Sequence, residues 1–188
     1  MEKLSGLTDE QIAALQKSRQ RVIESIGKNM ELYGVTLSVG HLYGHMLFKH
    51  EPVTLDEMAQ TLGLSKTSIS TGMRTLMDLK MINKVWSKGT RKDLYEVEMD
   101  WHQTFADYFV IKWRKGMEKN LQAVKKSRSE MLQMLEDNKD NQALADIVSK
   151  DIEKLNEAIK YYHWLGKLID AFESGEIFEF IPKETAES

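Results

Sequence analysis

Two short capped segments follow each other in the stretch "TLDEMAQTLGLSKTSISTGMRTLMDL", residues 54–79. Thr54 and Glu57 have the spacing of a capping box, in which the two side chains bond each other's backbone N–H groups at the start of a helix. Gly63 suits the end of that helix, and Ser65 suits the cap of the next one. Two helices joined by a short turn that contains glycine form a helix-turn-helix. The chain is therefore limited to folds that carry such a helix pair.

The second helix of this pair is rich in small hydroxyl side chains. Serine and threonine form helices poorly because their hydroxyl groups compete for backbone hydrogen bonds. Ile69, Met73 and Leu76 nevertheless keep the spacing of an apolar helix face. A slim outward face of short donors and one guanidinium can enter a major groove and bond base edges and phosphates. The residues of that face are Thr67, Ser70, Thr71 and Arg74.

A basic hairpin is predicted after the two helices. Residues 81–86 and 94–97 are typical of strands, and the connection "SKGTRKD" has a glycine at its tip. Residues 63–92 carry a net charge of +6, although the whole chain is at −3. A helix-turn-helix followed by such a hairpin is a winged helix, which we place at residues 38–100. The cations expected to reach the DNA backbone or minor groove from this wing are Lys88, Arg91 and Lys92.

The start of the second helix is a further candidate phosphate site. Ser65 and Lys66 lie where free backbone N–H groups and the positive end of the helix dipole favour anions. Considered separately, these features also fit an exposed Ser/Thr-rich helix with a solvated hairpin, or a winged helix used only for protein contacts. Their order along the chain favours DNA binding.

Long apolar stripes dominate the remainder of the chain. Near-heptad spacing predicts a helix from Trp101 to about residue 135 and another over residues 144–172. A helix of 35 residues spans ~50 Å, more than one small domain covers. We therefore expect a mainly α fold in which residues 101–188, with an acidic tail, form a long-helix dimerisation region. The N-terminal helix, within residues 1–37, is expected to contribute to dimerisation.

Composition excludes several classes of function. The chain has no cysteine, which excludes disulfides, cysteine nucleophiles and cysteine-bound zinc. No apolar run approaches the ~20 residues that cross a bilayer, and no signal peptide is recognisable, so we expect a cytoplasmic protein without membrane contact. A glycine-rich phosphate loop, an HExxH motif and a Ser/His/Asp grouping are missing, so we predict no enzyme and no cofactor. His41 and His45 lack a third ligand, and no metal site is predicted.

Two long stretches resemble a known family. They are "RVIESIGKNMELYGVTLSVGHLYGHM" and "LSKTSISTGMRTLMDLKMINKVWSKGTRKDLYEVEMDWHQTFADYFVIKWRK". The winged helix between an N-terminal helix and long C-terminal helices looks like the MarR superfamily, and these stretches resemble its GbsR-type repressors. The resemblance implies a homodimer on a palindromic operator of double-stranded DNA. It also implies control of choline uptake, glycine betaine synthesis or osmoprotectant import genes by choline or glycine betaine.

Aromatic residues concentrate at the start of the long helix, in "WHQTFADYFVIKW". A quaternary ammonium group donates no N–H bond, so proteins bind it with aromatic faces. The candidate cage is Tyr43, Trp101, Phe105 and Tyr108, and Tyr33 lies in an element expected to pack nearby. A stripe at this spacing is more often part of a helix core than of a ligand cage. A different effector, such as a phenolic acid, is the alternative to a quaternary ammonium compound. A bound effector would shift the two recognition helices of a dimer away from the ~34 Å spacing of successive major grooves.

Overall fold

The structure is a computed structural model that describes residues 6–87, 89 and 92–184. The chain divides into two compact units, Met1–Thr104 and Phe105–Ser188. The predicted segments 1–37 and 38–100 both fall within the first unit. None of the described helices combines the length and the apolar character of a bilayer-spanning segment.

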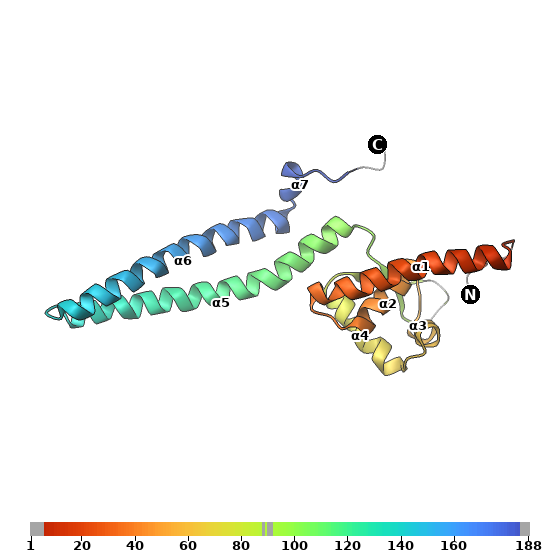
Figure 1. Ribbon diagram of the computed structural model, residues 1–188, viewed down its shortest axis with the longest axis horizontal. Coiled ribbons are helices and arrows are strands. Elements are labelled where there is room, and N and C mark those ends of the chain that lie inside the picture. The colour runs from red at the N-terminus through yellow and green to blue at the C-terminus, as the bar shows by residue number, and fades with distance from the viewer. Residues whose placement is uncertain (1–5, 88, 90–91, 185–188) are drawn as a thin grey trace. The chain divides into compact units, whose positions relative to one another are not determined.

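The first unit begins with two helices in close contact (Figure 1). Helix α1, Asp9–Asn29, starts at a capping box, continues into a 3-10 turn, Met30–Tyr33, and is followed by α2, Leu37–Leu47. Gly40 of α2 lies directly on α1, since a Cβ at this position would be 2.5 Å from the carbonyl oxygen of Gly27. Glycine is required there because the two backbones touch.

The predicted helix-turn-helix consists of α3, Leu55–Leu62, and α4, Lys66–Asp78. The turn between them contains Gly63 in the left-handed conformation, at φ 64°. The predicted apolar stripe of α4 is buried against side chains of α2 and α3, which fixes which face of α4 points outward. The residues of this core include Leu42, Met46, Met58, Ile69, Met73 and Leu76.

The wing is an antiparallel pair of strands, β1, Ile82–Val85, and β2, Leu94–Val97, with Ile82 opposite Val97 and Val85 opposite Leu94. Val53, just before α3, adds a single antiparallel bridge to Tyr95. This bridge ties the hairpin to the start of the helix-turn-helix. The predicted mainly α, winged helix-turn-helix fold class is confirmed.

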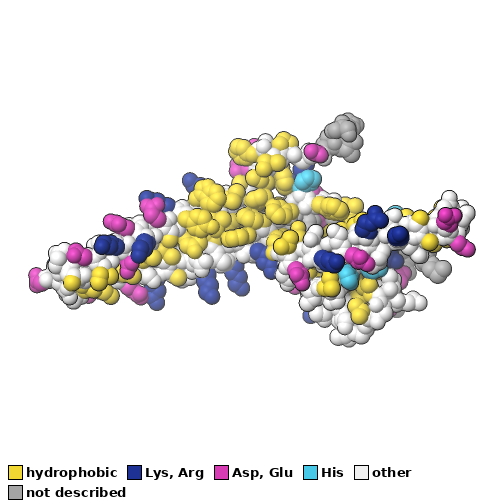
Figure 2. All heavy atoms as spheres, in the orientation of Figure 1, with side chains coloured by type: hydrophobic (Ala, Val, Ile, Leu, Met, Phe, Trp, Pro, Cys, Tyr) yellow, Lys and Arg dark blue, Asp and Glu magenta, His cyan; other side chains and the backbone are white. Residues whose placement is uncertain are grey.

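The second unit is a helical hairpin. Helix α5, Trp101–Asp137, begins in the first unit; α6, Gln142–Ser174, and the short α7, Ile177–Phe180, follow it. A small core forms between α5 and α6 around Met117, Leu165 and Ile169. Hydrophobic side chains also gather on the hairpin surface (Figure 2). Large apolar residues exposed on the parts of α5 and α6 that belong to the second unit are Phe105, Ile111, Trp113, Leu132, Met134, Ile147, Tyr161 and Trp164.

Candidate functional site

The outward face of α4 has the composition predicted from the sequence. Thr67, Thr71 and Arg74 are exposed, whereas Ser70 is half-buried. Arg74 has no ion pair within the described part of the chain, so its guanidinium is available to an external anion. The Ser65 hydroxyl caps the helix by accepting a hydrogen bond from the Ser68 N–H at 3.1 Å. Ser65 therefore presents mainly backbone, rather than a free hydroxyl, at the start of α4.

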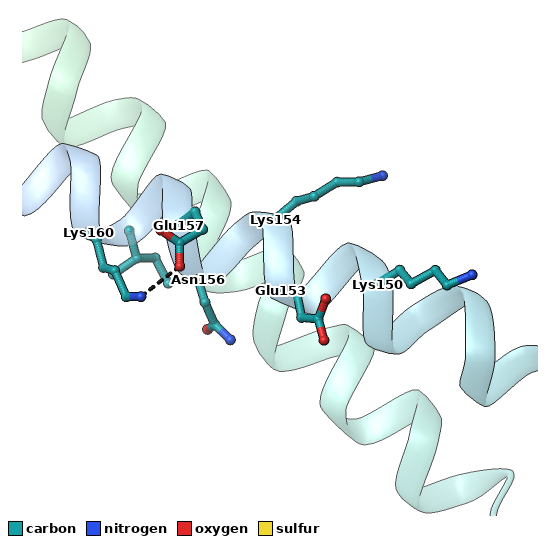
Figure 3. A pocket seen from close by; sticks show the side chains of 7 residues that line it. Lys150, Glu153, Lys154, Asn156, Glu157 and Lys160 are labelled. Atoms are coloured by element: carbon teal, nitrogen blue, oxygen red, sulfur yellow. Dashed lines mark hydrogen bonds and ion pairs between the residues drawn. The ribbon is translucent and has the colours of Figure 1, made fainter.

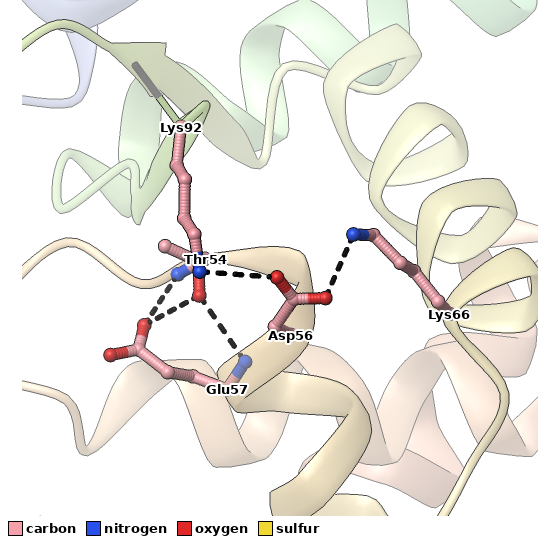
Figure 4. Close-up of polar contacts among 5 residues, drawn as sticks. All are labelled: Thr54, Asp56, Glu57, Lys66 and Lys92. Atoms are coloured by element: carbon pink, nitrogen blue, oxygen red, sulfur yellow. Dashed lines mark hydrogen bonds and ion pairs between the residues drawn. The ribbon is translucent and has the colours of Figure 1, made fainter. Parts of the chain in front are cut away.

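Asp56 joins the start of α4 to the wing (Figure 4). Its carboxylate lies 2.8 Å from the Nζ atom of Lys66 and 3.3 Å from that of Lys92. The hydrogen bond from Lys66, followed by the one from Lys92, lowers the pKa of Asp56. Two predicted phosphate-binding lysines thus share one carboxylate, which the sequence analysis did not identify. The other two wing cations, Lys88 and Arg91, lie outside the described residues.

The backbone beneath Asp56 is fixed by the predicted capping box (Figure 4). The Thr54 N–H donates to Glu57 Oε2 at 2.7 Å, and the Glu57 N–H donates to Thr54 Oγ1 at 3.2 Å. The bond from the Thr54 backbone is the main reason why the pKa of Glu57 is lowered. Because Asp56 lies inside this first turn, its carboxylate is held between the two lysines.

A cavity of about 190 Å³ lies inside the first unit. Tyr43 and Trp101, two of the predicted cage residues, line it, and Tyr33 supplies a third aromatic ring. The complete lining is Ile26, Asn29, Met30, Tyr33, Tyr43, Met81, Trp101 and Thr104. No sequence pattern predicts that Thr104 lines this cavity, because its position there depends on how the fold buries it.

The other two predicted cage residues belong to the second unit. The Phe105 ring lies 6.0 Å from that of Phe172 and 6.5 Å from that of Phe109, between centroids. The Tyr108 ring lies 5.8 Å from the Nζ atom of Lys112. Phe105 thus packs in the aromatic cluster that the alternative, core interpretation of this stripe predicts.

Tyr43, which lines the cavity, lies in the neighbourhood of Glu98. Burial, followed by the neighbouring Tyr33 and Glu98, raises the pKa of Tyr43 to about 12. Hydrogen bonds from the Asp100 backbone and the Asn83 side chain lower the pKa of Glu98, which keeps it ionised at neutral pH. A neutral phenol ring beside a carboxylate is a favourable environment for a cation.

Two other features carry no comparable chemistry. Burial, with the nearby His41, lowers the pKa of His45, and the described residues hold no group of three potential metal ligands. A broad hollow of about 900 Å³ follows α6 and is lined mainly by lysine and glutamate side chains (Figure 3). Lys160 is paired with Glu157 there at 2.6 Å. Such alternating charges are typical of a solvated helix face.

Comparison with known proteins decides the family. The chain is 37% identical over 172 residues to the putative HTH-type transcriptional regulator YvaV of Bacillus subtilis (strain 168), covering 92% of this chain and 97% of the relative. It is 36% identical over 175 residues to the HTH-type transcriptional repressor GbsR of the same organism, covering 93% and 97% of the two chains. The chain belongs to the GbsR family of transcriptional regulators.

Further matches agree with this family. Residues 101–179 match the GbsR family transcriptional regulator C-terminal helical hairpin. The HTH-type transcriptional repressor OpcR of Bacillus subtilis (strain 168) is 36% identical, covering 90% of this chain and 91% of the relative. A solved structure described as a transcriptional regulator shares the fold, with a TM-score of 0.51 and 19% identity over 85% of this chain and 98% of the other. The protein is thus a transcriptional regulator of the GbsR family, and the predictions of a regulator and not an enzyme are confirmed.

Proposed function

We propose that a quaternary ammonium compound, with choline or glycine betaine as the candidates, binds the aromatic cavity of the first unit and changes the affinity of this GbsR-family repressor for DNA. The genes controlled would be those for choline uptake, glycine betaine synthesis or osmoprotectant import, as the sequence resemblance implies. The observation that carries the proposal is the meeting of Tyr33, Tyr43 and Trp101 around one small cavity.

The chemistry of the lining supports a cation without N–H groups. Three aromatic side chains line the cavity, and each aromatic face attracts such a cation by ~0.5–2 kcal/mol, depending on desolvation. None of the eight lining side chains carries a positive charge. The alternative effector, a phenolic acid, needs a cationic partner for its carboxylate, so this lining disfavours it.

For DNA, we propose that a homodimer presents two α4 helices to a palindromic operator. Thr67, Ser70, Thr71 and Arg74 would contact base edges or phosphates, and the start of α4 and the wing would hold the backbone. The dimer would form through the large apolar side chains exposed on α5 and α6. Exposed apolar patches of this kind are typical of protein interfaces.

The DNA contact is tested with Arg74→Ala. The duplex is one that the wild-type protein selects from a random pool, and affinity is measured by fluorescence anisotropy at several salt concentrations. The proposed homodimer loses one contact in each subunit, which should weaken binding and, for phosphate contacts, reduce the salt slope by about 1.8, or about 0.9 for each contact. The matched control is Lys119→Ala, which removes an exposed cation from α5. Equal behaviour of the two variants would show that the α4 face is misassigned.

The effector is tested by titrating choline, glycine betaine and 4-hydroxybenzoate into the protein–DNA complex. Choline or glycine betaine should change DNA affinity for wild-type protein, and Trp101→Ala should abolish this response while retaining DNA binding. Phe180→Ala, which removes an exposed aromatic ring from α7, is the control. The proposed aromatic cage would be refuted if only the phenolic acid changed DNA affinity, or if Trp101→Ala bound choline as tightly as the wild-type protein.

A further inference from the structure

Thr104 is a buried hydroxyl residue without a hydrogen-bond partner. Its side chain is 6% exposed, and its Oγ1 atom finds no partner among the described residues. Two other helical threonines of the first unit satisfy their hydroxyl groups locally: Thr61 Oγ1 donates to the Glu57 carbonyl at 2.8 Å, and Thr75 Oγ1 donates to the Thr71 carbonyl at 3.1 Å. A buried polar group left unpaired in a folded protein needs a specific explanation.

The position of Thr104 supplies that explanation. It lies in the first turn of α5, where its backbone N–H donates to the Asp100 carbonyl at 2.9 Å, and it lines the same cavity as Tyr43 and Trp101. Threonine in a helix divides between two side-chain rotamers, so its hydroxyl can turn without disturbing the backbone. The unpaired hydroxyl therefore borders a space in which a ligand atom can become its partner.

The lining also limits what the polar end of that ligand can be. A carboxylate would meet no cationic side chain among the eight lining residues, and Glu98, close enough to raise the pKa of Tyr43, would repel it. Taking a carboxylate out of water without a charged partner is costly. An alcohol carries no charge and needs only one donor or acceptor, which Thr104 offers.

We infer that Thr104 hydrogen-bonds the hydroxyl group of a quaternary ammonium alcohol and is the residue that selects this class over the corresponding carboxylate. The inference deepens the proposed function and rests on it, since the cationic end of the ligand would occupy the aromatic cage. In this arrangement the rings of Tyr33, Tyr43 and Trp101 bind the quaternary ammonium head of the ligand, and Thr104 binds the hydroxyl group at its other end, the tail.

The test compares three probes by isothermal titration calorimetry on the full chain: choline, glycine betaine and tetramethylammonium, which has a cationic head and no tail. Wild-type protein should bind choline more tightly than glycine betaine. Thr104→Val keeps the shape of the side chain and removes its hydroxyl, so choline should bind about 3- to 10-fold more weakly, the effect of one neutral hydrogen bond. Tetramethylammonium binding should not change, and Thr104→Ser should retain choline affinity.

Several results would overturn the inference, and they separate it from the effector proposal. If choline and tetramethylammonium bind wild type, and Thr104→Val changes neither or weakens both equally, the role of Thr104 is wrong while the cage stands. Glycine betaine binding as tightly as choline would refute the selectivity. If none of the three probes binds wild type, the effector proposal fails as well. Thermal unfolding of Thr104→Val, with a midpoint at or above the wild-type value, verifies that the variant is folded.

Discussion

Replacing Asp56 with Asn removes a carboxylate that contacts two lysines of the proposed DNA-binding surface. Lys66 lies at 2.8 Å and Lys92 at 3.3 Å, so the group of three side chains carries one net positive charge, which becomes two in the variant. In the proposed complex, DNA phosphates would compete with the Asp56 carboxylate for these ammonium groups. We therefore expect Asp56→Asn to bind DNA more tightly than wild type at low salt.

The size of the effect follows from counterion release. Each subunit of the proposed homodimer gains one net charge, so about two more phosphates are neutralised and the slope of log K against log [salt] becomes steeper by about 1.8. Between about 50 and 200 mM salt, the variant should lose about 12-fold more affinity than wild type loses. Exposed ion pairs of this kind contribute little to folding, so the thermal midpoint should remain close to the wild-type value.

The assay is fluorescence anisotropy with the duplex selected by the wild-type protein, at four or more salt concentrations. Asp151→Asn is the matched control: it makes the same change in net charge on α6, where Asp151 pairs with Lys154 at 3.2 Å, and it should leave the slope unchanged. Adding Lys92→Ala to Asp56→Asn should return the slope to the wild-type value. Weaker binding of Asp56→Asn at every salt concentration would refute competition and show that the carboxylate orients the lysines for DNA.

Two further predictions concern the two units separately. Gly40→Ala should lower the free energy of unfolding in urea by ~1–3 kcal/mol, because the new Cβ would lie 2.5 Å from the Gly27 carbonyl oxygen. Gly116→Ala, where the new Cβ would lie in open space on α5, should instead be neutral or stabilising by up to ~1 kcal/mol. A Gly40→Ala variant as stable as the wild-type protein would contradict the close approach of α1 and α2. Trp164→Glu should dissociate the proposed dimer in sedimentation experiments, because Trp164 is 57% exposed in the apolar surface of the hairpin. Gln122→Glu, which adds the same charge at an exposed polar position of α5, should leave the dimer intact. A dimer that survives Trp164→Glu would exclude Trp164 from the interface.

Features that depend on neighbouring residues could be predicted from the sequence. The capping box at Thr54 and the Ser65 cap are present as expected, because a cap involves residues only three positions apart. The apolar stripe of α4 was predictable for the same reason, since Ile69 and Met73 follow the helical period and are 1% exposed. Local spacing therefore determined both the element order and the outward face of α4.

Features that depend on distant residues could not be predicted in this way. Val53 bridges Tyr95 as a single residue, which is too short for any periodic signal. Asp56 and Lys92 are 36 positions apart in the chain and meet only in the folded unit. In the aromatic run after the wing, Trp101 lines the cavity whereas Phe105 packs on Phe172, although both share one stripe in the sequence. The spacing of apolar residues along a long helix does not show which of them belong to the first unit and which to the second.

The composition of the cavity suggests how an effector would influence DNA binding. Its lining takes residues from α1, the 3-10 turn and α2, from Met81 shortly after α4, and from the first turn of α5. A ligand there contacts the segment that follows the recognition helix, so any difference in its affinity for two arrangements of that segment changes their populations. A coupling of ~1–3 kcal/mol corresponds to a 5- to 150-fold change in DNA affinity. If the effector changes DNA affinity as proposed, operator DNA must change the affinity for the effector by the same factor, because coupling between two binding sites is reciprocal.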